Sequence, residues 1–262
     1  MPIEHVSDTA RWVAVYRAME TERPDAIFRD PFARRLAGER GQAIVDEMKR
    51  GRSMAWAMIV RTAVFDEIIL DVIRREKVDL VVNLACGLDA RAWRLDVSPE
   101  LRWVDVDFPV MIDYKTEVMR GEKTVCKYEA IATDLTDDRT RSALFARLGA
   151  TAQRVLVISE GLLIYLTPDD VGKLARDLHA QPSFKWWVID IAHPQLLKMM
   201  TKMWGGAVSG GNAPFLFAPE EGTAFFLPFG WREREFRGNM QEAKRLKREM
   251  AGMWFWQLFG LF

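Results

Sequence analysis

Three acidic residues stand where apolar, β-branched runs of the sequence end. Asp107 and Glu160 close two of these runs, and Asp134 directly follows a third. If the runs are parallel strands, their carboxyl ends meet at one edge of a sheet, which is where open α/β folds bind ligands. Carboxylates accept hydrogen bonds from hydroxyl, amino and ammonium groups. We therefore expect the three side chains to face one ligand at that edge.

A small turn with a single glycine follows the first apolar run. Ala85 and Gly87 fit a dinucleotide-binding pattern only if small residues replace two glycines, although Asp107 has the spacing of a ribose-binding acid. A pyrophosphate would bind at the N-terminus of the following helix, where Asp89 adds a negative charge. The loop therefore favours a nucleoside cofactor without phosphate but with a positive charge, and S-adenosylmethionine fits.

The strand-end residues can then be assigned to parts of that cofactor. Asp107 can accept both ribose hydroxyls, Asp134 can meet the adenine amino group, and the backbone of Leu135 can meet the ring edge. Glu160 is positioned for the ammonium end. An aspartate after a strand is also a common helix N-cap, and Asp134 could have that role in the next helix.

Two further charges interrupt apolar sequence and need partners. Glu160 lies inside the run "VLVISEGLLIYL", where a carboxylate would be buried. Arg61 is the only charged residue between Ala55 and Phe65. A buried arginine needs an anion, and the cofactor's carboxylate and Asp66 are the two candidates.

The elements that must hold these residues alternate between helix and strand. A long buried helix is predicted at about 54–75, and arginine-rich helices at 1–53 are expected to lie over the carboxyl edge of the sheet. Strands are predicted at 80–86, 101–107, 126–133, 154–160 and 184–192, with helical spacing between them and further strands at 217–222 and 225–236. This alternation predicts a parallel sheet with helices on both faces.

Charge and composition exclude several classes of partner. Lysine plus arginine equals aspartate plus glutamate, 37 against 37, so we expect no nucleic-acid or membrane partner. The charged stretch 242–250 is predicted to be a solvated helix face. The first residues lack an apolar signal core, and two cysteines suit a reducing compartment, so a cytoplasmic protein is expected. The aromatic segment 253–262 is expected to be a buried strand or an interface patch.

The sequence resembles the leucine carboxyl methyltransferase family, and in particular its bacterial small-molecule O-methyltransferases, which include the carboxyl methyltransferase of tetracenomycin synthesis. The motifs that resemble it occur in the family's order as "RTAVFDEIIL", "VVNLACGLDARAWRL", "VDVDFPVMIDYK", "ATDL" and "SEGLLIYLTPDDV". The resemblance covers about residues 8–175 and becomes weak after 195.

The resemblance implies a class I, Rossmann-like methyltransferase: an α/β fold with a mostly parallel seven-stranded sheet, helices on both faces and a helical N-terminal and inserted cap. The chain would be one domain, with a cap at 1–53, a cofactor-binding core at 54–193, a flap at 194–223 and C-terminal strands and a helix at 224–262.

The same resemblance assigns roles to residues of this chain. Arg61 would bind the carboxylate of S-adenosyl-L-methionine, and Gly87 with Ala85 would line its methionine part. Asp107, Asp134, Leu135 and Glu160 would have the roles given above, Tyr165 would face the acceptor, and no metal is implied. Ala85 stands where the family has glycine, which is tolerated if its φ is negative and a methyl group fits beside the ligand.

The acceptor is less constrained than the cofactor. We expect methyl transfer to a carboxylate or hydroxyl oxygen of a small, apolar molecule of secondary metabolism, by a monomer or homodimer. His193 is the best-placed base, although a structural hydrogen bond at the strand end is the more common role for such a histidine. The glycine-rich stretch 202–217 is expected to cover the acceptor. Alternatives are protein C-terminal carboxyl methylation, transfer to carbon or nitrogen, an NAD-dependent oxidoreductase and a non-enzymatic binding protein.

Overall fold

The computed structural model describes residues 7–48, 55–210 and 214–249, with only the backbone of 7 and 203–210. Its strands are β1 (Leu80–Leu84), β2 (Arg102–Asp107), β3 (Lys127–Ala132), β4 (Val155–Ser159) and β5 (Phe184–Ile189). Its helices are α1 (Ser7–Thr21), α2 (Ala33–Glu47), α3 (Ala55–Glu76), α4 (Arg91–Arg94), α5 (Pro109–Val118), α6 (Asp138–Ala150), α7 (Pro168–His179), α8 (Pro194–Gly210) and α9 (Asn239–Arg245), with 3-10 helices η2 (Leu163–Tyr165) and η3 (Gly222–Phe229).

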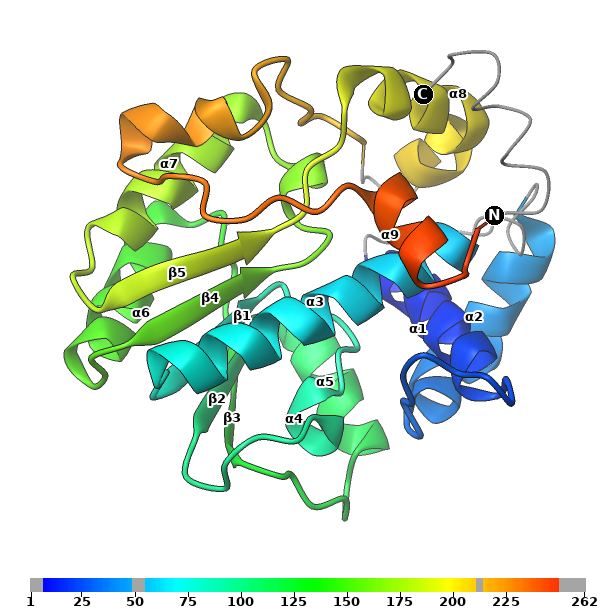
Figure 1. The fold of residues 1–262 in the computed structure, drawn as a ribbon, viewed down its shortest axis with the longest axis horizontal. Helices are drawn as coiled ribbons and strands as arrows, with labels where there is room; N and C mark the ends of the chain where they lie inside the picture. Colours follow the sequence, from blue (N-terminus) through cyan, green and yellow to red (C-terminus); the bar gives the residue numbers. More distant parts are fainter. Residues whose placement is uncertain (1–6, 49–54, 211–213, 250–262) are drawn as a thin grey trace.

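The five strands form one parallel sheet in the order β3-β2-β1-β4-β5 (Figure 1). The chain first builds outward from β1 to β3 and then crosses to β4 on the other side of β1. The reversal opens a crevice at the carboxyl ends of β1 and β4, where open parallel sheets bind ligands. The predictions of five parallel strands and of the long helix, α3, are confirmed.

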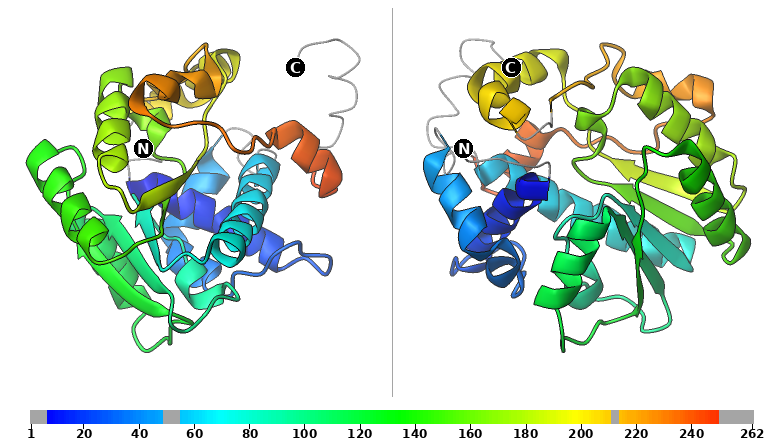
Figure 2. Two further views of the ribbon diagram at one scale, coloured as in Figure 1. Left: turned by 60° about the vertical axis from the view of Figure 1, so that its left-hand side comes forward. Right: turned by 180° about the vertical axis from the view of Figure 1, so that it is seen from behind.

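Side chains alternate between the two faces of the sheet and bury both of them. On one face Val81 and Ile158 pack in a cluster with Phe65 and Ile69 of α3. Val82, the next residue of β1, points to the other face and packs with residues of α6 and α7. Figures 1 and 2 show α3 across one face of the sheet and α6 and α7 behind the other. The central strands β1 and β4 are therefore covered on both sides, which explains why these two strands are almost wholly apolar, whereas the edge strand β3 is partly exposed.

The prediction of seven strands is wrong for the described part of the chain, which has five. The segments 217–222 and 225–236 form the 3-10 helix η3 and irregular chain instead of strands. Pro228 lies inside η3 and has no N–H for a strand ladder. The aromatic rings that suggested strands pack against the core, with Phe226 edge-on to Trp187 at a centroid distance of 5.4 Å.

The N-terminal helices cover the loop that follows β1. Arg17 of α1 donates to the backbone carbonyl of Leu88 at 2.5 Å and pairs with Asp30 at 2.8 Å. The segment after α9 also contacts these N-terminal helices. Arg248 pairs with Glu20 of α1 at 2.8 Å, and both side chains are buried. The prediction that 242–250 is a solvated face is therefore wrong for Arg248.

Two sequence predictions concern the last third of the chain. Residues 202–210 of the expected glycine-rich flap belong to helix α8, so that part is not a loop. The aromatic segment 253–262 lies outside the described residues. Among the described helices, none combines the length and apolar character that crossing a membrane requires.

Candidate functional site

A cavity of about 670 Å³ opens at the carboxyl edge of the sheet. Its walls come from α1, α3, the loop after β1, the ends of β4 and β5, the start of α8 and the segment before α9. Arg61, Ala85, Gly87, Glu160 and Tyr165 all line it. Five of the residues singled out in the sequence therefore meet in one place. The described residues contain no cluster of three or more histidine, cysteine or acidic side chains suited to a metal ion.

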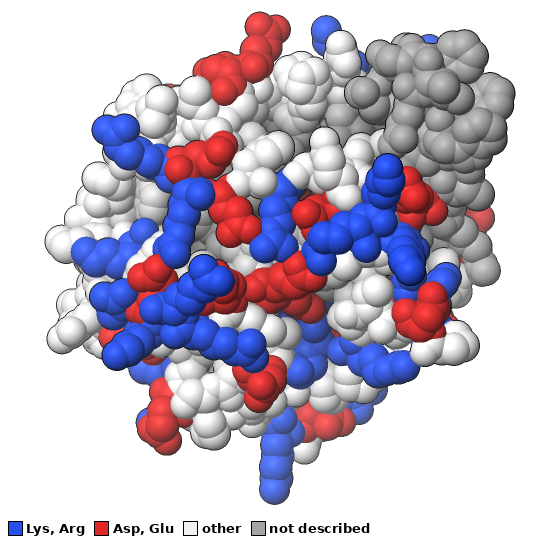
Figure 3. Space-filling view, in the orientation of Figure 1, with Lys and Arg blue, Asp and Glu red and all other residues white. Residues whose placement is uncertain are grey.

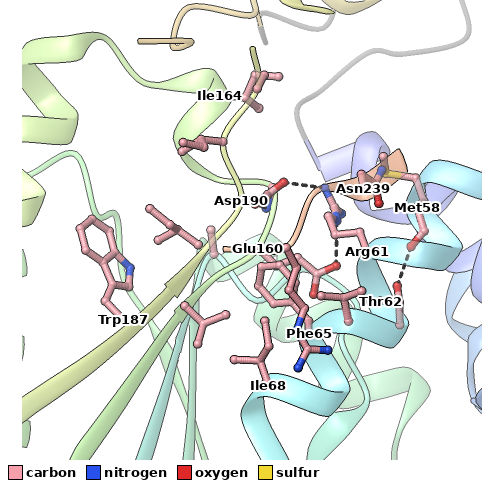
Figure 4. Close-up of a pocket in the computed structure, with 18 of the residues that line it drawn as sticks. Met58, Arg61, Thr62, Phe65, Ile68, Glu160, Ile164, Trp187, Asp190 and Asn239 are labelled. Carbon is pink, nitrogen blue, oxygen red and sulfur yellow. Dashed lines mark hydrogen bonds and ion pairs between the residues drawn. The ribbon is translucent and has the colours of Figure 1, made fainter. Parts of the chain in front are cut away.

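Glu160 is held by two arginines at the end of β4. Its Oε1 accepts a hydrogen bond from Arg61 Nε at 2.9 Å (Figure 4). Its Oε2 accepts one from Arg91 Nη1 at 2.6 Å. Burial opposes ionisation of this carboxyl, but Arg91 and Arg61 outweigh burial and lower the pKa of Glu160. Glu160 is therefore an anion whose position in the cavity wall is fixed from two sides.

Arg61 has a second acidic partner that the sequence analysis did not identify. Its Nη1 lies 3.1 Å from Oδ2 of Asp190, the residue that follows β5, and Figure 4 shows the guanidinium between Asp190 and Glu160. The remaining nitrogen, Nη2, has no hydrogen-bond partner among the described residues. Because Arg61 lines the cavity and its side chain is 16% exposed, it can offer these donors to an anionic ligand. Asp66, the structural alternative, does not pair with Arg61.

Asp66 instead belongs to a network centred on Arg91. Arg91 Nε donates to Asp66 at 2.6 Å, and its Nη1 donates to Asp89 at 2.8 Å. Burial opposes ionisation of Asp89, but Arg91 and Lys115 outweigh it and hold the pKa of Asp89 well below its usual range. The charge of Asp89 is therefore largely compensated. The repulsion of phosphate inferred from the sequence is weaker than a bare carboxylate would produce.

Ala85 adopts the left-handed backbone region, with φ of +49°. The condition stated for an alanine at this position, a negative φ, is therefore not met. The chain turns sharply here so that the backbone N–H of Cys86 can donate to the Val106 carbonyl at 3.2 Å. Gly87 has a φ of +51°, and a methyl group on it would lie 3.0 Å from the Cβ of Ala10 in α1. The loop therefore passes closely beneath the cap.

Asp107 supports this loop from behind. Its Oδ2 accepts from the backbone N–H of Gly87 and its Oδ1 from that of Phe108, both at 2.7 Å. Burial raises the pKa of Asp107, against the lowering effect of these two hydrogen bonds. Asp107 adjoins the cavity through Gly87 without itself lining it, and each of its oxygens retains a lone pair for a further donor.

Asp134 and Leu135 lie farther out along the same edge. Ala132, at the end of β3, pairs in register with Asp107, which places Asp134 two residues beyond that pair. Asp134 is exposed and accepts from Thr136 N at 2.8 Å, so it caps its own turn. Leu135 offers its carbonyl to Arg141 at 2.9 Å. Neither residue lines the cavity.

The two candidates for the acceptor side differ in position. Tyr165 lines the cavity and packs against Phe215 with ring centroids 5.7 Å apart, and burial raises the pKa of its hydroxyl. His193 is exposed, and its Nδ1 accepts from the backbone N–H of Gln195 at 3.3 Å at the start of α8. His193 does not line the cavity.

The sequence contained a signal for the residue that was missed. Asp190 follows an apolar strand just as Asp107 and Glu160 end theirs, so the same strand-end argument would have selected it. Arg91 itself had no such signal, because Asp66, Asp89 and Glu160 meet around it only when α3 packs on the sheet.

Comparison with known proteins fits this arrangement. A model of the leucine carboxyl methyltransferase family matches residues 10–179, which contain β1 to β4 and the loop with Gly87. The chain belongs to the leucine carboxyl methyltransferase family. The family match includes Arg61, Asp107 and Glu160, whereas Asp190 lies beyond it.

Relatives in this family include proteins named as S-adenosyl-L-methionine-dependent methyltransferases. One from Streptomyces coelicolor is 38% identical over 66% of this chain and 64% of its own length. One from Mycolicibacterium smegmatis is 32% identical over 66% of this chain and 62% of its own length. The matched part thus spans less than two thirds of these relatives.

Two solved structures share the fold. A protein named as a methyltransferase from Thermobifida fusca YX superposes with a TM-score of 0.59 over 91% of this chain and 90% of that chain, at 13% identity. A DUF574 family protein from Streptomyces avermitilis gives 0.56 over 81% of this chain and 80% of that one, at 15% identity. At this identity the likeness concerns the fold alone.

Proposed function

We propose that this protein is an S-adenosyl-L-methionine-dependent methyltransferase. The observation that supports it most is the Arg61–Glu160 pair in the cavity wall, where Arg61 keeps an Nη2 that bonds to none of the described residues. A zwitterionic amino-acid end needs one cationic and one anionic partner side by side, and this pair supplies both. Arg61 would bind the carboxylate, Glu160 the ammonium group, and the backbone at Ala85 and Gly87 would line the methionine part.

The nucleoside part would extend from the loop toward β3. Asp107 would accept the ribose hydroxyls with the lone pairs that Gly87 and Phe108 leave unused. Asp134 and Leu135 would meet the adenine at the outer rim. Oδ1 of Asp134 accepts the backbone N–H of Thr136, so its Oδ2 would accept the hydrogen bond from the amino group of the adenine.

An oxygen of a small, apolar molecule is the acceptor we propose, and it is supported by the apolar side chains that line the cavity. These include Trp12, Ile164, Tyr165, Phe215 and residues at the start of α8. When bound, the cofactor supplies a methyl group on a sulfonium, which an acceptor oxygen takes by in-line displacement without protonation of the leaving group. Holding the acceptor in line can supply about 7–11 kcal/mol of the barrier in favourable cases.

Different acceptors would make different demands on this chain. A carboxylate acceptor is ionised at neutral pH and needs no base. A hydroxyl would need a proton acceptor, and Tyr165, whose pKa is raised, would serve as a hydrogen-bonding neutral phenol instead. Methylation of a protein C-terminus is the second candidate, favoured by the family match itself. A role in secondary metabolism, a cytoplasmic location and a monomeric or dimeric state belong to the same proposal.

Calorimetric titration with S-adenosylhomocysteine, NAD and NADP tests the cofactor assignment. We expect saturable binding of S-adenosylhomocysteine alone. Asp107→Ala should weaken that binding by about 1.5–3 kcal/mol, the value of hydrogen bonds to a charged group. Asp79→Ala, at the opposite end of β1, is the matched control and should leave affinity unchanged. Micromolar NAD binding would refute the proposal.

A further inference from the structure

Asp190 joins two parts of the site that come from different elements. Its Oδ1 accepts the backbone N–H of Gly161 at 2.6 Å, and its Oδ2 lies 3.1 Å from Arg61 Nη1. Gly161 directly follows Glu160, and Arg61 Nε donates a hydrogen bond to Glu160. Asp190 therefore fixes both the arginine and the backbone from which its anionic partner projects.

The packing around Gly161 shows how tightly this arrangement is set. Gly161 has a φ of +68°, and a methyl group placed on it would lie 3.2 Å from Arg61 Nη1. The backbone of Gly161 thus lies directly against the guanidinium. The hydrogen bond to Asp190 holds this left-handed residue in place, since the side chain of Asp190 comes from the neighbouring strand.

Charge explains why a carboxylate suits this position. Burial lowers the pKa of Arg61, but Asp190 and Glu160 outweigh burial and raise it. With two N–H groups directed to Glu160 and Asp190, the guanidinium has one defined orientation, with Nη2 left for the cavity. Without Asp190, the guanidinium could rotate about its bond to Glu160.

We propose that Asp190 is a positioning residue for the amino-acid end of the cofactor, acting through Arg61 and Gly161. This assignment rests on the proposed function. Substituting Asp190 should therefore weaken the binding only of ligands that have an amino-acid end. The nucleoside part, bound at the loop after β1 and along β2 and β3, lies outside its reach.

Asp190→Asn is the informative substitution. An asparagine has one acceptor oxygen, so its amide would place a donor against either Gly161 N–H or Arg61 Nη1. We expect S-adenosylhomocysteine to bind about tenfold more weakly, which is the lower range for a hydrogen bond to a charged group. Binding of 5′-methylthioadenosine, which lacks the amino-acid end, should stay within twofold. Asp190→Ala should give the same pattern if Asp190→Asn does not fold.

Two controls separate positioning from general damage. Asp177→Asn changes a carboxylate outside the cavity that likewise pairs with a buried arginine, Arg141 of α6, and should affect neither ligand. Adding Asp190→Asn to Arg61→Lys should cost little beyond Arg61→Lys alone, because the two residues act as one unit.

The outcomes are distinguishable. Unchanged or tighter binding of S-adenosylhomocysteine by Asp190→Asn would overturn the assignment, and so would equal losses for both ligands. If the unaltered protein binds no S-adenosylhomocysteine, the proposed function itself is refuted, and this assignment with it.

Discussion

Replacing Ala85 by glycine should stabilise this protein. Ala85 has a φ of +49°, a region that costs a residue with a Cβ roughly 1–2 kcal/mol. Glycine pays no such cost but loses about 0.5–1 kcal/mol through the greater freedom of its unfolded chain. The net gain in the free energy of unfolding is about 0.5–1 kcal/mol. For a chain of this size that corresponds to a rise in Tm of about 1–4 °C.

Thermal unfolding followed by circular dichroism measures this shift, and Ala90→Gly is the matched control. Ala90 is fully buried in the same loop but has a φ of −113°. Glycine there relieves no strain and removes a buried methyl group worth about 0.8 kcal/mol. We expect Ala85→Gly to raise Tm and Ala90→Gly to lower it. If both substitutions lower Tm by similar amounts, the backbone strain inferred at Ala85 is absent.

Three further predictions concern buried charges and thiols. Arg248→Ala should lower the free energy of unfolding by about 3 kcal/mol in urea titration, because it leaves the buried Glu20 with only the more distant Arg23, at 3.8 Å, as a cationic partner. Arg245→Ala, which removes exposed pairs with Glu67 and Glu242, should cost less than about 1 kcal/mol, and equal costs would contradict the buried-pair argument. The mixed charges of this face are seen in Figure 3. The pKa of Asp89 is lowered in the folded protein, so Asp89 contributes its full stabilisation above the unfolded pKa of about 4, and this contribution is lost as the pH falls further. In Asp89→Asn, the free energy of unfolding should therefore decline less steeply between about pH 4 and 2 than in the unaltered protein. An unchanged slope would contradict this reasoning. Burial raises the pKa of Cys126 to about 11 and that of Cys86 well above its usual value. A thiol reagent at pH 8 should therefore label the native protein slowly and the denatured protein at two sites. Rapid labelling of the native protein would show that the thiols are accessible.

The sheet could be predicted from sequence because its signal is local. The five strands are short, mostly apolar runs, and helical spacing separates them, so alternation alone predicts that the strands are parallel. The loop at Gly87 and the anchors Arg61 and Glu160 could be found because a charge in an apolar run needs a partner. These features depend on neighbouring residues and on one general rule of sheet edges.

Features that depend on distant packing could not be predicted in this way. The apolar segment around Phe226 resembles a strand, yet it folds into η3 because its rings find partners on Trp187 and α7. Arg248 stands in a run of alternating charges, but it forms a buried pair with Glu20, which is 228 residues away in the sequence. The sign of φ at Ala85 likewise depends on how the loop meets β2.

A crystal structure with S-adenosylhomocysteine tests the central claim most directly. We expect the carboxylate of the ligand within hydrogen-bond distance of Arg61 Nη2 and its ammonium group against Glu160, with Asp190 still bound to Gly161. A ligand whose amino-acid end lies elsewhere, or a dinucleotide whose diphosphate occupies the loop at Gly87, would contradict the account.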